Sequence, residues 1–178
     1  MSSEDCVLCN IEKGELGSYK IYEDEKVIAA LAPEPASLGH IILFPKKHYQ
    51  IIELVPDYEI AYLFNIANKL SIAVFESLGM QGTNILIQNG NPAGQEIPHL
   101  AINIIPRKED DNLNFQWKPK QLDEEEISVV EIQLKQACET IGKFEKEEKK
   151  LPLNIEKKIE VIKEKKNNYL FKQLERIP

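Results

Sequence analysis

The chain has 178 residues, of which 43% are hydrophobic and 29% are charged, and this composition suits one folded domain with an appended segment. A mean hydropathy of −0.33 and the absence of any apolar run approaching about 18 residues argue against a membrane-spanning protein. Residues 1–5 are polar and acidic, without a basic stretch followed by an apolar one. We therefore expect no secretory signal and a cytoplasmic location.

The net charge of −7 hides an asymmetry along the chain. Residues 141–178 contain 11 Lys or Arg and seven Glu, a charge of +4, which leaves −11 for the rest. An acidic body argues against a domain built to coat nucleic acid, whereas the basic tail could contact phosphate. Such Lys/Glu mixtures are most often solvated helix faces, which need no partner. Because the tail is basic, an RNA- or ribonucleoprotein-associated protein stays an alternative.

Five short apolar segments predict strands, because Gly, Pro and Asn residues typical of turns bound them. They are residues 19–22, 26–31, 40–44, 84–88 and 99–105. Apolar residues at helical spacing follow Val55-Pro56-Asp57 and stop at Gly79, which predicts one long amphipathic helix. Strands, a helix and further strands, without regular alternation, indicate an α+β fold with an antiparallel sheet of about five strands.

The pattern changes after Arg107. Apolar residues then recur in steps of three and four, which predicts a helix whose apolar seam packs against another surface. The seam comprises Ile127, Val130, Leu134, Ala137 and Ile141. A charged run over 143–150 ends at Pro152, and a second helix is predicted over 155–174. We divide the chain into a domain of residues 1–120 and a C-terminal helical arm of residues 121–178.

Three cysteines, an odd number, argue against a disulfide framework and favour a reducing compartment. Cys6 and Cys9 have the spacing of a metal-binding pair or a redox dithiol. No thioredoxin-like βαβ pattern surrounds them, which disfavours the redox alternative. Cys138 falls on an apolar helical stripe and is predicted to be a core residue.

The segment from Gln88 to Arg107 carries the most chemical information. If residues 99–105 form a strand, His99, Ala101 and Asn103 share one face, and the apolar residues between them share the core face. The preceding loop is rich in Gly, Asn and Gln, whose backbone N–H groups and side-chain amides suit an anion.

Over residues 6–108 the chain resembles the histidine triad (HIT) superfamily, closest to its fragile-histidine-triad and archaeal-type branches. The resemblance rests on Cys6-Val-Leu-Cys9, on Gly39-His40-Ile-Ile-Leu-Phe-Pro-Lys-Lys-His48, and on Ala93-Gly-Gln through Pro106-Arg107. It implies an antiparallel sheet with one long helix and a homodimer whose two sheets join. It also implies hydrolysis or transfer at the α-phosphate of a nucleotide through a nucleotidyl-histidine intermediate.

The chain departs from the family pattern at the residues that do this chemistry. Ala101 stands where the family has its nucleophilic His, and Asn103 replaces the third His of the triad. Ala32 stands where relatives typically have Asp or Asn for the ribose hydroxyls. Because a methyl group cannot attack phosphorus, we expect a noncatalytic HIT protein, a nucleotide sensor or scaffold. A residual or engineered-inactive nucleotidyl hydrolase is the other alternative.

The resemblance also implies a zinc site, since many bacterial and archaeal-type members bind zinc at four positions that match here. These are Cys6, Cys9, His48 and His99. Two thiolates and two imidazoles would close the coordination sphere, so the zinc is expected to be structural. Two free cysteines and two unrelated histidines are the alternative.

Other polar residues could still contact a nucleotide by neutral hydrogen bonds, although plain turn and loop roles explain them as well. They are His40, Gln88, Asn89, Gly94, Gln95 and Asn103. Trp117 could stack on a base or, as we favour, pack the arm onto the core.

Overall fold

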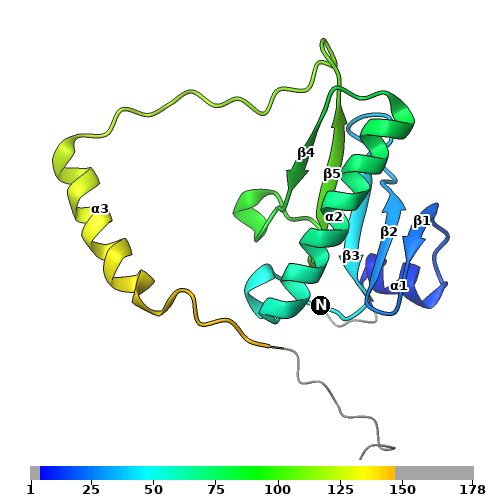
Figure 1. Ribbon diagram of the computed structural model, residues 1–178, viewed down its shortest axis with the longest axis horizontal. Helices are drawn as coiled ribbons and strands as arrows, with labels where there is room; N and C mark the ends of the chain where they lie inside the picture. The colour runs from blue at the N-terminus through cyan, green and yellow to red at the C-terminus, as the bar shows by residue number, and fades with distance from the viewer. Residues whose placement is uncertain (1–4, 147–178) are drawn as a thin grey trace, which may run out of the picture. The chain divides into compact units, whose positions relative to one another are not determined.

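The computed structural model describes residues 5–146, and all of its helices and strands belong to one compact unit that ends at Glu145. Its sheet has the order β1-β2-β3-β5-β4, and every neighbouring pair is antiparallel (Figure 1). The elements are α1 (Val7–Lys13), β1 (Lys20–Glu23), β2 (Val27–Leu31), β3 (Ile41–Pro45), α2 (Asp57–Leu78), β4 (Gly82–Leu86), β5 (Ile102–Arg107) and α3 (Glu124–Ala137). The predicted α+β fold, with a five-stranded antiparallel sheet and one long helix, is confirmed.

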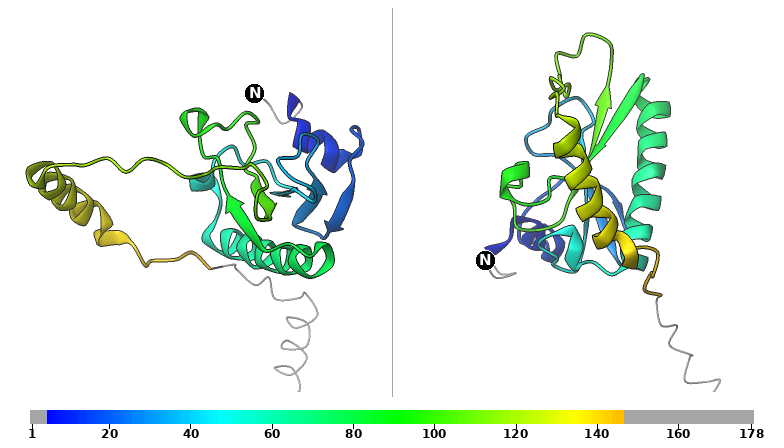
Figure 2. Two further views of the ribbon diagram at one scale, coloured as in Figure 1. Left: turned by 90° about the horizontal axis from the view of Figure 1, so that it is seen from above. Right: turned by 90° about the vertical axis from the view of Figure 1, so that its left-hand side faces the viewer.

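The central strands are buried on both faces, which explains why they read as continuous apolar runs. Val27 and Ala29 of β2 join one cluster, which contains the inward side chains of α2. Ile28 of β2 and Phe44 of β3 join a second cluster, which contains the apolar side chains of α1. The sheet therefore lies between α2 on one face and α1 on the other (Figure 2).

Helix α2 begins and ends where the sequence indicates. Pro56 precedes it, Asp57 and Glu59 place negative charge in its first turn, and Gly79 ends it in a left-handed conformation with φ +58°. Its inner side chains pack on β3, β4 and β5. It also exposes four large apolar residues, namely Phe64, Ile72, Phe75 and Leu78.

The predicted strand over 99–105 is wrong at its start, because β5 begins at Ile102. The N–H of His99 donates to the carbonyl of Ile97, and the N–H of Leu100 donates to the carbonyl of Tyr49. The N–H groups of residues 99 and 100 therefore bond to loops instead of to β3 or β4. Gln88 likewise lies beyond the end of β4 at Leu86.

Helix α3 of the C-terminal arm forms, and none of its side chains is buried within the chain, so packing of its apolar seam against a partner surface stays a prediction. The arm differs from the sequence prediction in two respects. Trp117 is 83% exposed and does not pack on the core. Cys138 is exposed and is not a core residue. The predicted helix over 155–174 lies outside the described residues.

None of the helices that the structure describes has the length and apolar character of a membrane span.

Candidate metal centre and adjoining pocket

Four potential metal ligands from three distant segments converge beside α1. Cys6 is the N-cap of α1, Cys9 lies in its first turns, His48 follows β3, and His99 precedes β5. Their ligand atoms all lie within 4.8 Å of one another. Cys9 Sγ is 3.2 Å from His48 Nδ1 and 3.5 Å from His99 Nδ1, and Cys6 Sγ is 3.4 Å from His99 Nδ1.

The three separations of 3.2, 3.4 and 3.5 Å are close to those of tetrahedral coordination. Metal–ligand bonds of about 2.0–2.3 Å place neighbouring ligand atoms about 3.3–3.8 Å apart. Both thiols and His99 are buried, so solvent has little access to these three ligands. Cys6, Cys9, His48 and His99 can thus hold a metal ion, as the sequence predicted.

The hydrogen bond of His99 prepares this imidazole to be a ligand. Its Nε2–H donates to the carbonyl oxygen of Pro45 at 2.9 Å, which leaves the lone pair of Nδ1 facing the thiols. Burial lowers the pKa of His99 to about 4, although the bond to Pro45 acts in the opposite direction. The imidazole is therefore neutral at pH 7, which is the form that binds a metal.

Without a metal, the cluster contains a protonated thiol and an unpaired imidazole nitrogen. Burial, aided by the hydrogen bond and charge of Cys6, raises the pKa of Cys9 to about 11, so the bare thiol is protonated. Nε2 of His48 is buried and has no hydrogen-bond partner among the described residues. A dication bound by the thiolates and by Nδ1 of His48 and His99 would stabilise the deprotonated thiols, so the donor set fits a metal such as zinc.

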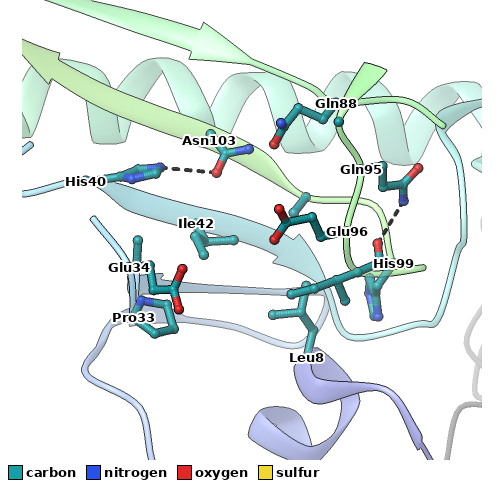
Figure 3. Close-up of a pocket in the computed structure, with 14 residues that line it drawn as sticks. Leu8, Pro33, Glu34, His40, Ile42, Gln88, Gln95, Glu96, His99 and Asn103 are labelled. Atoms are coloured by element: carbon teal, nitrogen blue, oxygen red, sulfur yellow. Dashed lines mark hydrogen bonds between the residues drawn. The ribbon is translucent and has the colours of Figure 1, made fainter. Parts of the chain in front are cut away.

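A cavity of about 380 Å³ opens beside this cluster on the α1 face of the sheet (Figure 3). Ile42 of β3 and Asn103 of β5 line this cavity. His40, which directly precedes β3, and Ala101, which directly precedes β5, line it as well. His99 lines both the cavity and the metal cluster. The cavity therefore brings together five of the six predicted nucleotide contacts: His40, Gln88, Gly94, Gln95 and Asn103.

His40 and Asn103 form a fixed pair within the cavity. The backbone N–H of Ala36 donates to His40 Nδ1 at 3.1 Å, so Nε2 carries the proton and donates to Asn103 Oδ1, also at 3.1 Å (Figure 3). Burial lowers the pKa of His40, although the bond to Asn103 partly offsets it. Both nitrogens of this imidazole are thus already engaged.

The amide of Gln95 is mostly used within the protein. Its Oε1 accepts from the N–H of Gly90, and its Nε2 donates to the carbonyls of Gln50 and Ile97. Gly94 has φ +86°, and a Cβ there would meet the side chain of Gln88 at 2.7 Å, so glycine is required beside Gln88.

Asn89 does not line the cavity, unlike the other predicted contacts. Its Nδ2 donates to the carboxylate of Glu53, and its Oδ1 accepts from the N–H of Ile52. The sequence analysis missed Glu34 and Glu96, whose carboxylates lie at the cavity (Figure 3). The only signal in the sequence is that Glu34 lies two residues after Ala32 and that Glu96 directly follows Gln95.

A second cavity of about 600 Å³ lies between α1 and the sheet, and the sequence analysis did not predict it. Val7, Leu8 and Ile11 of α1 line one side of it, and Phe44 of β3 lines another. It shares part of its wall with the first cavity.

The sequence matches the HIT domain over residues 13–110. The chain belongs to the HIT family. An uncharacterised HIT-like protein of Methanocaldococcus jannaschii is 41% identical over 106 residues, which are 60% of this chain and 81% of that protein. This archaeal HIT relative agrees with the resemblance seen in the sequence.

Two further HIT proteins bear on function. The adenylylsulfatase HINT3 of Arabidopsis thaliana is 40% identical over 109 residues, and the chain spans 55% of its length. The crystal structure of a zinc-bound histidine triad family protein from Mycobacterium smegmatis is 30% identical, with a TM-score of 0.61 over 76% of this chain and 99% of that chain. The HIT fold is therefore shared with both an enzyme and a zinc-bound protein.

Proposed function

We propose that this chain is a noncatalytic HIT protein of the cytoplasm, stabilised by zinc, that binds a nucleoside- or nucleotide-like ligand in the cavity beside the zinc site without hydrolysing it. The observation that carries the proposal is Ala101, whose methyl group lines the cavity at the position where the family has its nucleophile. Removing an enzyme's nucleophile costs about 4 to 6 orders of magnitude in rate.

The remaining imidazoles of the cavity support the same conclusion. His99 faces Cys6 and Cys9 with one nitrogen and Pro45 with the other. His40 has both nitrogens hydrogen-bonded. Neither ring offers a free nitrogen to a phosphorus atom. The alternative of a residual hydrolase would have to use a carboxylate such as Glu96.

The donor set supports zinc over other metals. Two cysteine sulfurs and two imidazole nitrogens within 4.8 Å of one another form a donor set typical of structural Zn²⁺, whereas Mg²⁺ and Ca²⁺ prefer oxygen. With four protein ligands no position is open to a water molecule, so the zinc would stabilise the fold and take no part in a reaction.

Two surface features support a homodimer. Strand β4 lies at one edge of the sheet, and no strand among the described residues pairs with its outer backbone groups. The neighbouring helix α2 exposes Phe64, Ile72 and Phe75. A second copy that pairs along β4 would extend the sheet and cover these side chains.

The division of the chain into a domain of residues 1–120 and an arm of residues 121–178 is likewise our proposal. The match to the HIT domain ends at residue 110, inside the proposed domain.

Restoring the triad tests the proposal. The double variant Ala101→His, Asn103→His should gain hydrolysis of a nucleoside phosphoramidate or a dinucleoside polyphosphate, because the rest of the pocket is present. The wild-type chain should show no turnover above buffer and no labelled nucleotidyl-enzyme. Ala101→Gln is the matched control, because it adds bulk without a nucleophile. Turnover by the wild-type chain would contradict the noncatalytic assignment.

The basic charge of residues 141–178 favours one second candidate, an RNA- or ribonucleoprotein-associated protein. Phosphate contacts by its Lys and Arg residues would make RNA binding strongly salt-dependent.

A further inference from the structure

Helix α3 exposes large apolar side chains on two of its faces. Ile127, Val130 and Leu134 recur in steps of three and four and share one face, whereas Val129 and Ile132 share another. Each of these five side chains is at least 50% exposed. Exposed apolar area of this extent is typical of an interaction surface. We call the face formed by Ile127, Val130, Leu134 and Ala137 the α3 seam.

The charge around the seam is unevenly distributed and mostly negative. Residues 123–131 contain five Asp or Glu and no Lys or Arg, a charge of −5. Residues 132–146 contain three Lys and two Glu, a charge of +1. An RNA backbone or an anionic membrane surface would repel the acidic half of the helix, so neither suits the seam.

This uneven charge makes the seam complementary to itself when two copies run antiparallel. A parallel pair would bring the acidic residues 123–131 of both chains together, whereas an antiparallel pair places them beside residues 132–146 of the other chain. Side-chain size agrees with this direction. The register that sets Val130 opposite Leu134 also sets Ile127 opposite Ala137, so a large side chain faces a small one.

The segment that precedes α3 is long enough to bring the helix to a second copy. Residues 108–123 lie between β5 and α3 without forming a helix or strand, and such a segment can extend to about 50 Å. A single helix of 14 residues is only marginally stable in water, so two of them need to be held together by other contacts. A dimer of the bodies would do this, because tethering raises the effective concentration of the two helices.

We propose that the α3 seam is an interface between two copies of this chain, in which the two α3 helices pack against each other antiparallel. Leu134 of each copy contacts Val130 of the other, and Ile127 contacts Ala137. This proposal rests on the homodimer of the proposed function and adds a second contact to it, separate from β4 and α2. The C-terminal arm is then part of the dimer.

Disulfide cross-linking of the zinc-loaded full chain tests the pairing, in a Cys138→Ser background that lacks the exposed native cysteine. Ile127→Cys and Ala137→Cys chains with different tags, expressed together, should form a disulfide between unlike chains on mild oxidation. Neither variant alone should form a disulfide-linked dimer. Gln136→Cys is the matched control, because it neighbours Ala137 but faces away from the seam, and it should not link to Ile127→Cys.

A charge within the seam tests what the contact contributes to the dimer. Leu134→Glu should raise the dissociation constant of the dimer about tenfold or more, because it removes an apolar contact and buries a carboxylate. Gln136→Glu adds the same charge outside the seam and should leave the constant unchanged. Leu134 is 59% exposed in the single chain, so the variant should fold and keep its zinc.

The outcomes separate this proposal from the proposed homodimer. Ile127→Cys chains that link to one another would mean a parallel pair and would overturn the proposal. A dimer weakened by Leu134→Glu without a link between residues 127 and 137 would place the seam on the body of the second copy, which also contradicts the pair. A wild-type dimer that neither variant affects would leave only the homodimer, and a monomeric wild-type chain would refute both.

Discussion

His99 donates from Nε2 to the carbonyl oxygen of Pro45 at 2.9 Å, and this bond turns its Nδ1 toward Cys6 and Cys9. Pro45 ends β3, and His48 follows three residues later. The end of β3 therefore positions both imidazoles. Pro45 holds His99 through a hydrogen bond, and the short segment after Pro45 carries His48. A metal bound here would join α1 to the sheet.

The first prediction concerns zinc. Cys9→Ser should reduce the zinc content from about one per chain, the count for one four-ligand site, to well below one. It should lower the free energy of unfolding by about 3 kcal/mol, the stabilisation that a ligand gives at about 100 times its dissociation constant. Metal analysis and thermal unfolding of reduced protein check both outcomes. Chelation of the wild-type protein should have the same effect.

Cys138→Ser is the matched control, because this cysteine is exposed and lies outside the cluster. It should leave both the zinc content and the unfolding temperature unchanged. Wild-type protein that contains no zinc when purified under reducing conditions would contradict the site.

Sequence reasoning found the metal cluster because its ligands lie in recognisable short motifs. It misplaced the start of β5, because the alternation of apolar residues through Leu100 and Ile102 does not reveal that Leu100 bonds to the loop residue Tyr49. It missed the larger cavity for a different reason. A cavity is bounded by residues such as Ile11 and Phe44 that pack incompletely, and periodicity indicates only that they face inward.

The second prediction concerns the protonation of His40. Burial lowers its pKa below the ordinary value of 6.5, so the native chain binds fewer protons there than the unfolded chain. The neutral ring's contribution to stability is then complete above pH 6.5 and is lost as the pH falls toward the native pKa. Because zinc would hold the other two histidines, nuclear magnetic resonance should show a single imidazole titrating below pH 6.5.

Asn103→Asp tests the cause of this shift. A carboxylate in place of the amide would face the Nε2–H of His40, and the charge pair should raise the pKa of His40 by about one unit or more. Asn103→Leu removes the bond without adding charge and should lower the pKa further. An unchanged pKa in both variants would show that Asn103 does not contact His40 in solution.

The third prediction concerns the proposed dimer. Phe75 is 52% exposed on the outer side of α2, so Phe75→Glu should place a charge in the interface without disturbing the core. Sedimentation should then show a monomer, whereas the wild-type chain should sediment as a dimer. Glu76→Lys, a change of charge at a neighbouring exposed residue, should leave the dimer intact. A wild-type monomer at micromolar concentration would contradict the proposed interface.

The fourth prediction separates the two candidate functions. The described side chains of residues 143–146 are exposed, and the candidate metal ligands and the residues that line the cavity beside them all precede residue 104. Deletion of residues 143–178 should therefore leave the zinc content unchanged. If the chain acts through its nucleoside pocket, ligand affinity should also survive the deletion. If it acts on RNA, the deletion should abolish a binding that weakens steeply between about 50 and 200 mM salt. Loss of RNA affinity with an intact, empty pocket would favour the RNA-associated function over the ligand-binding one.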